Sequence, residues 1–487
     1  MAVLSTAPEF VQRIDKGAAF VERLWQEDGV IYGVTTGYGD SCTVAIPGAL
    51  VGELPEHLYT FHGCGLGDVF NLAETRAIVA ARLASLAQGF SGVRYALLEQ
   101  LQRLLAHDIL PVIPQEGSVG ASGDLTPLSY VAAVLAGERD VFYGGERRPT
   151  ADVFAELDIA PLRLGPKETL AVMNGTAVMT GLACLALERS RYLAALCCRV
   201  TSLGVLATQG NANHFEPRLF AAKPHPGQAR CAARIYGDLA DHQWDRQGAR
   251  LQDRYSLRCA PHVIGVLEDC LPWFTEVVMT ELNSANDNPL IDPDEERVLH
   301  GGHFYGGHIA FVMDSLKNAV ANQADLIDRQ LAQLVDTKFN HGLPANLSGA
   351  EGERQALNHG FKAVQIGASA WTAEALKLCM PASVFSRSTE CHNQDKVSMG
   401  TIAARDALRV LQLTEQVVAA GLLGACQALN LRLRDSASNA PALTEPVQAT
   451  LEAVAQWFPL LIEDRPLEIT LRETLSQIQN RSLTLYD

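Results

Sequence analysis

The chain has 487 residues, 48% of them hydrophobic and 19% charged, and its formal net charge is −16. This length allows a large buried core, and the negative charge argues against general attraction to nucleic acid or to an anionic membrane. Eleven irregularly spaced cysteines are typical of reduced thiols. Since no apolar run reaches about 18 residues and no signal-peptide pattern is present, we expect a cytoplasmic protein that acts on a small molecule.

Long amphipathic or apolar segments dominate the chain, and strand-like alternation is scarce. The helix-like stretches cover residues 71–88, 168–208, 308–335, 353–378 and 402–433. The stretch 168–208 is apolar nearly all round, which is typical of a helix at the centre of a bundle. We therefore predict a mainly α fold: a long-helix bundle with a smaller, loop-rich N-terminal part. No linker divides residues 1–487, so we treat them as one unit, with 1–205 carrying a special loop and 206–487 forming the bundle and the C-terminal part.

Near the N-terminus, residues 31–40 interleave glycine with tyrosine and threonine, which suits a loop that holds a polar side chain over a pocket. Tyr32 is the candidate there. A phenol has an ordinary pKa near 10, so positive charge or hydrogen bonding must make it more acidic before it acts as a base at neutral pH. The alternative is a loop tyrosine that is packed by its ring.

Residues 117–128 contain a tripeptide, Ala121-Ser122-Gly123, that can become an electrophile by cyclising on itself. Attack of the Gly123 amide nitrogen on the Ala121 carbonyl, with loss of two waters, gives a methylidene-imidazolone ring with an electron-poor methylene. The attack needs a sharply bent backbone, and three glycines at three-residue spacing permit it. The alternative, which is compatible with the first, is a loop that leads into a helix with Thr126 as N-cap and Pro127 at the first helical position.

Further along, Asn174 precedes a strongly apolar helix, so its amide should be buried and need a partner; the alternative is an Asn-Gly turn. Residues 252–258 place Gln252, Tyr255 and Arg258 three residues apart, where they can project together. An arginine fork suits the carboxylate of an amino acid, although a lone arginine is more commonly part of a surface ion pair.

Two polar segments in the second half could suggest a metal, but their spacing does not support one. His303 and His308 lie five residues apart, and Cys391-His392 lies within the polar stretch 386–400. Neither has a second liganding pair at zinc-type spacing. We therefore expect no metal and interpret 386–400 as a pocket wall or surface loop.

Together these segments resemble the signature of the aromatic amino acid ammonia-lyase and aminomutase family, which includes the histidine, phenylalanine and tyrosine ammonia-lyases. The resemblance implies that Ala121, Ser122 and Gly123 form a 4-methylidene-imidazol-5-one group autocatalytically, with no metal or external cofactor. It also implies a homotetramer whose active sites are shared between subunits, and a small aromatic amino acid as substrate.

The resemblance also implies a role for most of the candidate residues. Tyr32 corresponds to the base that removes the β-proton of the substrate, Arg258 to the group that binds the carboxylate, and Asn174 to a residue that holds substrate and prosthetic group. Tyr255 and Gln252 correspond to residues beside the substrate and the ring.

Later in the chain, Glu390 corresponds to the acid near the substrate amine and Gln394 to a reader of the side chain. Phe304 matches a phenylalanine beside the ring, whereas His303 replaces the usual asparagine and changes the local hydrogen bonding.

Specificity in this family is read largely from two adjacent residues, which here are Phe61 and His62. Phenylalanine enzymes resemble Phe-Leu at this point, tyrosine enzymes His-Leu and histidine enzymes Ser-His, so the pair is a hybrid. His62 indicates a polar ring substituent, unless it is a core histidine that fills space. The neutral Gln394 argues against imidazole, because histidine enzymes carry a glutamate there.

We therefore rank tyrosine first, phenylalanine second and histidine third, and expect bacterial tyrosine-specific members to be most similar. A tyrosine 2,3-aminomutase is the close alternative. A non-catalytic helical ligand-binding assembly is a remote one. A fumarate-type lyase would give no reason for the Ala-Ser-Gly tripeptide.

Overall fold

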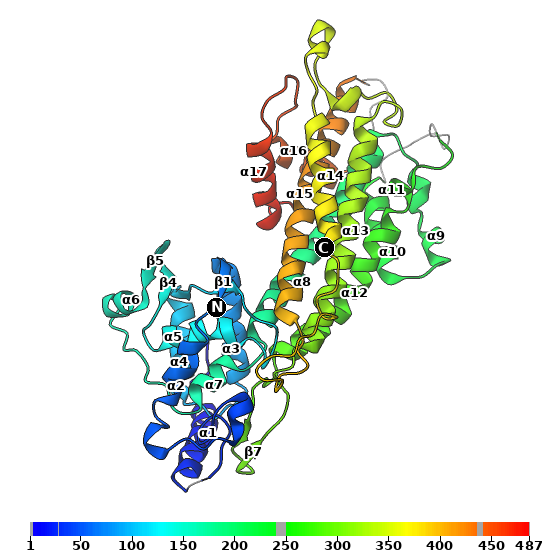
Figure 1. Ribbon diagram of the computed structural model, residues 1–487. Helices are drawn as coiled ribbons and strands as arrows, with labels where there is room; N and C mark the ends of the chain where they lie inside the picture. The colour runs from blue at the N-terminus through cyan, green and yellow to red at the C-terminus, as the bar shows by residue number, and fades with distance from the viewer. Residues whose placement is uncertain (1–2, 28, 240–249, 436–441, 487) are drawn as a thin grey trace. The chain divides into compact units, whose positions relative to one another are not determined.

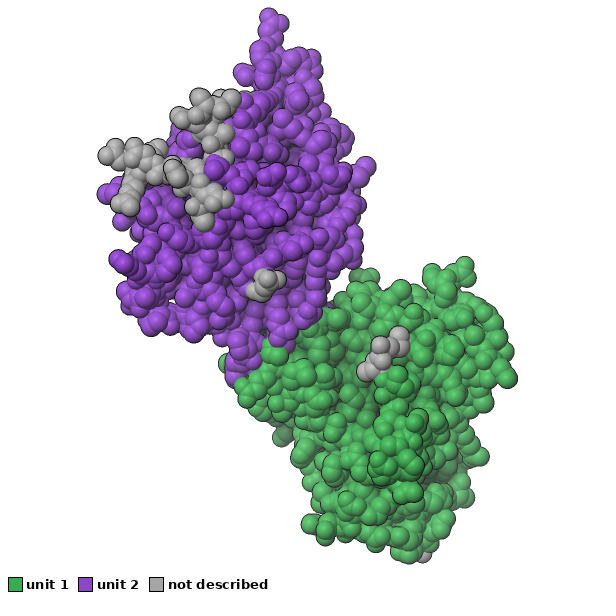
Figure 2. All heavy atoms as spheres, turned by 180° about the vertical axis from the view of Figure 1, so that it is seen from behind, with its two compact units in different colours: residues 1–185, 275–314, 381–405 green, residues 186–274, 315–380, 406–487 purple. Residues whose placement is uncertain are grey.

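The structure is a computed structural model that describes residues 3–27, 29–239, 250–435 and 442–486. The chain forms two compact units, each assembled from three separate stretches (Figure 2). Unit 1 comprises Met1–Leu185, Thr275–Asp314 and Pro381–Arg405. Unit 2 comprises Ala186–Phe274, Ser315–Met380 and Asp406–Asp487. Among the described residues, no helix is long and apolar enough to cross a membrane.

Unit 1 combines short helices with three small antiparallel sheets. Its helices are α1 (Pro8–Gln26), α2 (Leu54–Phe61), α3 (Leu72–Leu86), α4 (Tyr95–Ala106), α5 (Leu125–Leu135), α6 (Thr150–Glu156) and α7 (Glu168–Met173). Its strands are β1 (Leu66–Val69), β2 (Leu110–Pro111), β3 (Pro114–Glu116), β4 (Asp140–Tyr143), β5 (Glu146–Pro149), β6 (Leu290–Asp292) and β7 (Arg297–Leu299). They pair as β1-β3, β2-β4-β5 and β6-β7.

Unit 2 is helical in its described part. It contains α9 (Pro217–Ala221), α10 (Pro226–Asp238), α11 (Tyr255–Arg258), α14 (Lys362–Lys377), α16 (Glu445–Ala455) and α17 (Glu468–Gln479). Four long helices contribute residues to both units: α8 (Ala177–Ala207), α12 (Ala260–Leu282), α13 (Gly307–Val335) and α15 (Gly400–Asp435). The predicted mainly α fold, with a loop-rich N-terminal part, is confirmed.

In unit 2, α13, α14 and α15 lie side by side (Figure 1), and α8 contacts two of them. Polar side chains join them within an otherwise apolar interior. Arg189 of α8 forms a two-bond pair with Glu415 of α15, both bonds at 2.8 Å. Gln330 of α13 donates from Nε2 to Thr201 Oγ1 of α8 at 2.9 Å. α8 is buried along most of its length, as its all-round apolar sequence predicts.

Three helix boundaries differ from the expected ones. The predicted helix 71–88 begins after Asn71, which forms a capping box with Glu74. The predicted stretch 353–378 becomes helical in α14 only from Lys362. The predicted stretch 168–208 is divided into α7 and α8 at residues 174–176, where Gly175 has a φ of +147°. This break brings the backbone of Gly175 to the site described next.

Candidate active site

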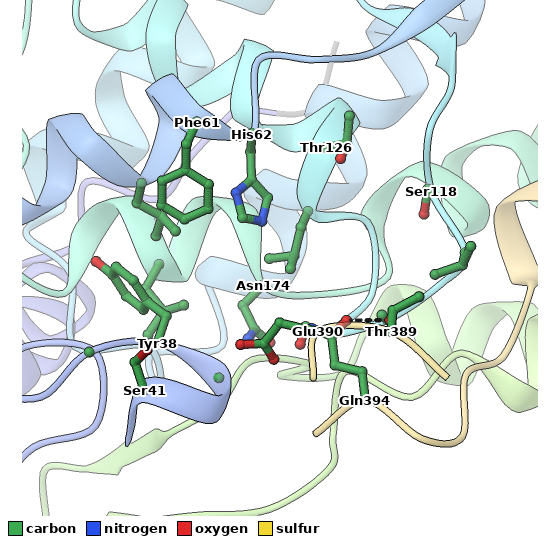
Figure 3. A pocket seen from close by; sticks show the side chains of 18 of the residues that line it. Tyr38, Ser41, Phe61, His62, Ser118, Thr126, Asn174, Thr389, Glu390 and Gln394 are labelled. Carbon is green, nitrogen blue, oxygen red and sulfur yellow. Dashed lines mark hydrogen bonds between the residues drawn. The ribbon is translucent and has the colours of Figure 1, made fainter. Parts of the chain in front are cut away.

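A cavity of about 590 Å³ lies in unit 1, within the size range of small-molecule sites. Figure 3 shows its walls, which come from five separate segments of the chain. Residues 32–41, the C-terminal end of α2, residues 117–126, the α7–α8 junction and residues 389–394 contribute to it. Of the thirteen predicted site residues, Tyr32, Phe61, His62, Ala121, Ser122, Asn174, Glu390 and Gln394 line this cavity.

The cyclisation-prone tripeptide lies in a sharp bend of the cavity wall. Ser122 has a φ of +52° and Gly123 a φ of +77°, so two consecutive residues have left-handed backbone. The bend packs against the α7–α8 junction, where the Gly175 amide donates to the Ser122 carbonyl at 3.1 Å and the Asp124 amide donates to the Gly175 carbonyl at 2.9 Å. A Cβ atom on Gly123 would overlap the carbonyl of Gly175. Only glycine therefore fits at position 123.

These contacts fit the ring that the tripeptide could form. The chain is held on both sides of Gly123, but within the described part of the chain neither the Gly123 amide nor the Ala121 carbonyl takes part in a hydrogen bond. These are the two groups that must react with each other. Ser122 also faces the cavity, so the methylene that its side chain would become would be open to a ligand.

The helix after the bend starts earlier than predicted. We expected Thr126 as N-cap and Pro127 at the first helical position, but α5 begins at Leu125 with Asp124 as N-cap. The Asp124 carboxylate instead caps α8, because its Oδ2 accepts from the backbone amides of Val178 and Met179 at 3.0 and 3.1 Å. Burial raises the pKa of Asp124 to about 6. Asp124 was not among the predicted site residues, although it directly follows the tripeptide.

Asn174 is buried, as predicted, at the junction of α7 and α8, and its side chain faces the cavity (Figure 3). Its Oδ1 atom is buried and has no hydrogen-bond partner among the described residues, so it is a polar group that needs a partner. Its carbonyl accepts from Nη1 of the fully buried Arg82 at 2.9 Å. Arg82 therefore stabilises the backbone of the α7–α8 junction.

Two tyrosines of the 31–40 loop line the cavity. The Gly39 amide donates to the hydroxyl of Tyr32 at 2.7 Å, but burial outweighs this bond and raises the pKa of Tyr32, and the nearby Glu390 adds to the rise. The acidification that we expected is therefore not produced within one chain. Tyr38 was not predicted as a site residue, although it lies in the same glycine-rich loop; its hydroxyl is buried without a partner in the described structure.

Phe61 is the last residue of α2 and His62 is its C-cap, and the two form one wall of the cavity (Figure 3). Their ring centroids are 4.4 Å apart, and Phe61 is exposed whereas His62 is half-buried. Burial lowers the pKa of His62 to about 4, so the imidazole is neutral at pH 7. Its Nδ1 atom is buried and has no partner among the described residues.

Glu390 and Gln394 face the cavity from the opposite wall (Figure 3). Glu390 accepts from the Asp40 amide at 2.7 Å and from Asn393 Nδ2 at 2.9 Å. Gln394 Oε1 accepts from Thr389 Oγ1 at 2.8 Å. The polar stretch 386–400 is thus a pocket wall, one of the two alternatives proposed from the sequence.

Phe304 lines a second cavity, of about 390 Å³, which shares Tyr32, Ser122 and Gln394 with the first. His303 is exposed and lines neither of the two cavities. Within the described ranges, no group of three His, Cys, Asp or Glu residues could hold a metal ion.

The remaining predicted residues, Gln252, Tyr255 and Arg258, belong to unit 2 and line neither of these cavities. Tyr255 and Arg258 are the ends of the single-turn helix α11, and the guanidinium lies 4.7 Å from the centroid of the Tyr255 ring. Tyr255 is 73% exposed. Arg258, the predicted carboxylate-binding group, is half-buried in unit 2, and its Nε atom is buried without a hydrogen-bond partner among the described residues.

Comparison with known proteins identifies the family of this chain. Residues 1–456 match the family described as aromatic amino acid lyase. A histidine ammonia-lyase from Gloeobacter violaceus is 39% identical over 429 residues, which cover 88% of this chain and 83% of the relative. A tyrosine ammonia-lyase from Cupriavidus metallidurans is also 39% identical, over 457 residues that cover 89% and 84%.

Among solved structures, a tyrosine aminomutase from Streptomyces globisporus has a TM-score of 0.91 at 35% identity, and the match covers 99% of this chain and 93% of that one. The family match spans nearly the whole chain and includes the bent tripeptide, the tyrosine loop and the α7–α8 junction. The chain belongs to the aromatic amino acid lyase family and is a carbon–nitrogen lyase.

Proposed function

We propose that this protein eliminates ammonia from L-tyrosine to give trans-4-coumarate, using a 4-methylidene-imidazol-5-one group formed from Ala121, Ser122 and Gly123. The observation that carries the choice of tyrosine is His62, a neutral imidazole in the cavity wall with an unpartnered buried nitrogen. A site built to hydrogen-bond a hydroxyl discriminates strongly against the analogue that lacks it. The relatives do not decide the substrate: most of the similar ones are named for histidine, but one named for tyrosine is, at 39%, as identical to this chain as the histidine ammonia-lyase from Gloeobacter violaceus.

The residues of this chain would bind and orient the substrate and move one proton. The ring, once formed, supplies an electrophile that turns the substrate amine into a leaving group. Tyr32 removes the β-proton, and Asn174 holds the substrate through its free amide oxygen. Glu390 faces the amine from the opposite wall, while His62 contacts the phenol hydroxyl and Gln394 reads the side chain.

We also propose that the enzyme is a homotetramer in which Gln252, Tyr255 and Arg258 of one subunit complete the cavity of another. The first cavity supports this proposal, because Glu390 is the one Asp, Glu, Lys or Arg among the described residues that line it. An amino acid substrate carries a carboxylate that needs a cation. We also propose a cytoplasmic location, because all eleven cysteines are free thiols.

The substrate is tested by incubating the purified protein separately with L-tyrosine, L-phenylalanine and L-histidine and recording the near-ultraviolet bands of coumarate, cinnamate and urocanate. Coumarate should form fastest. Intact mass measured on the same preparation should be lower than the sequence mass by two waters, and Ser122→Ala should restore the full mass and abolish turnover. Urocanate as the main product would refute the assignment of tyrosine, and an active Ser122→Ala variant would refute the mechanism.

A second candidate function is a tyrosine 2,3-aminomutase, which the structural similarity to such an enzyme favours. The two activities differ in whether ammonia leaves the site or returns to the β-carbon. Chromatography of the products decides between them, because an aminomutase accumulates the β-amino acid.

The shared site is tested by mixing two inactive variants, Tyr32→Phe and Arg258→Ala, under conditions that exchange subunits. If the tyrosine and the arginine come from different subunits, mixed tetramers contain some sites without either substitution and regain activity. Light scattering on the unmixed protein gives the number of subunits. A tetramer with no regained activity after exchange would refute the shared site.

A further inference from the structure

Arg139, at the start of the β4–β5 hairpin, lies against the last turn of α2, the helix that ends in Phe61 and His62. Its Nη2 atom donates to the Tyr59 carbonyl at 2.6 Å, and its Nη1 atom donates to Ser129 Oγ at 3.1 Å. The last carbonyls of a helix have no partner within the helix. Arg139 therefore satisfies one of them and ties the end of α2 to α5.

Ser129 extends this connection to the specificity pair itself. It is buried in α5, and its hydroxyl lies 2.7 Å from the Thr126 carbonyl and 3.2 Å from the His62 carbonyl. The backbone of His62 is thus joined, through Ser129 and Arg139, to the helix that begins immediately after the bent tripeptide. This connection links the Phe61-His62 wall to the segment that follows the 121–123 tripeptide.

Further contacts fix both the backbone and the side chain of Arg139. Arg139 has a φ of +61°, a backbone conformation that costs a non-glycine residue energy. Its carbonyl is fixed by the amide and the hydroxyl of Thr150, both at 2.9 Å, and its guanidinium stacks on Tyr130 at 4.2 Å from the ring centroid. A Cβ atom on Gly63 would overlap Nη2, so the chain leaves open the space that the guanidinium fills.

Glu138, the neighbour of Arg139, contacts the same turn of α2. The buried Tyr59 donates its hydroxyl to Glu138 Oε1 at 2.7 Å. Two successive residues therefore hold Tyr59, one through its side chain and the other through its carbonyl. A single surface ion pair would not give this directional contact.

We propose that Arg139 and Ser129 are positioning residues for substrate selectivity, because they fix the Phe61-His62 wall at the distance from the 121–123 tripeptide that one aromatic ring requires. This inference rests on the proposed function, in which that wall reads the substrate ring. Neither residue lines the cavity, so their effect passes through the position of α2.

Arg139→Gly tests the proposal, because glycine removes the side chain and also relieves the left-handed backbone, which favours folding. Asp158→Gly is the matched control: Asp158 is an exposed residue of unit 1 with a φ of +53° and does not line the cavity. Arg139→Lys and Ser129→Ala provide variants that keep more of the local packing. Intact mass verifies ring formation in each, and kcat and KM are measured for the preferred amino acid of the unmodified enzyme and for its best competitor.

We expect Arg139→Gly to form the ring and to lower the ratio of kcat/KM for the preferred amino acid to that for the competitor by about tenfold, mostly through KM. Ser129→Ala and Arg139→Lys should shift the ratio in the same direction by less, and Asp158→Gly should leave it unchanged. A merely structural role would lower both activities equally and leave the ratio unchanged, which would overturn the inference. An unmodified enzyme that is silent with all three amino acids would instead refute the proposed function, and this inference with it.

Discussion

Replacing His62 by leucine should reverse the preference of the enzyme between tyrosine and phenylalanine. In the unmodified protein, phenylalanine leaves the buried Nδ1 of His62 without a partner, whereas in His62→Leu it is the tyrosine hydroxyl that faces an apolar side chain. Each unsatisfied buried group costs about 1–3 kcal/mol. The two effects add, so the ratio of kcat/KM for tyrosine to that for phenylalanine should fall by about 2–6 kcal/mol, or roughly 30-fold to 10⁴-fold.

The assay is the initial rate of coumarate and cinnamate formation over a range of substrate concentrations. His57→Leu is the control, since His57 is an exposed residue of the same helix and lies outside the cavity. A ratio in His62→Leu that equals that of the unmodified enzyme would show that His62 only fills space and would refute the reasoning.

His62→Leu should also change how the stability of the protein depends on pH. Burial lowers the pKa of His62 from 6.5 to about 4, so the folded state favours the neutral ring. Above pH 6.5 the ring is neutral in both the folded and the unfolded state. As the pH falls from 6.5 toward 4, the unfolded state binds a proton that the folded state does not, so the free energy of unfolding decreases by at most about 3 kcal/mol. His62→Leu removes this loss, so thermal melts of the variant and of the unmodified protein should diverge between pH 6.5 and 4. Parallel melts over that range would contradict the assignment of a buried, neutral His62.

Three further predictions concern the tripeptide and the base. Gly123→Ala should not form the ring, because the added Cβ atom overlaps the Gly175 carbonyl. The control Gly144→Ala should form it, because Gly144 has a similar φ of +60° but open space around it. Intact mass distinguishes the two variants, and a Gly123→Ala protein that is lighter than its sequence by two waters would contradict the prediction. Tyr32→Phe should form the ring and lower kcat by about 10²–10⁴-fold, and a variant with nearly full turnover would exclude Tyr32 as the base. Because burial raises the pKa of Tyr32, catalysis that needs its phenolate should increase with pH by about tenfold per unit until another step limits the rate; a flat profile would count against the phenolate.

Regular helices could be predicted from the sequence wherever local periodicity decides them. The expected 308–335 is α13 within one residue, because an amphipathic stripe of that length needs no information from elsewhere. The break at Gly175 could not be predicted, since the apolar pattern runs through it. It exists because the Gly175 backbone pairs with Ser122 and Asp124, more than 50 positions earlier in the chain. The same pairing starts α5 at Leu125 and not after Thr126.

The site residues follow the same division between local and long-range information. Tyr32, Asn174 and His62 could be proposed because the motifs around them resemble those of the family, and all three line one cavity. Arg139 could not be proposed, because in the sequence it is an arginine in a polar turn. Its left-handed backbone is not evident from the sequence, and its bond to the Tyr59 carbonyl joins residues 80 positions apart in the chain.

The charges around the first cavity explain why one chain alone would make a poor catalyst. An amino acid brings a carboxylate, and Glu390 is the one Asp, Glu, Lys or Arg among the described residues of the wall, so like charges would repel at short range. Burial, together with the carboxylate of Glu390, raises the pKa of Tyr32 and so lowers the fraction of Tyr32 that is ionised at neutral pH. A guanidinium placed in this cavity would correct both defects, since it would pair with the substrate and lower the pKa of the phenol. Arg258 is carried by unit 2 on a helix whose tyrosine is 73% exposed, and this electrostatic deficit is the physical reason to expect the arginine of another subunit in the site.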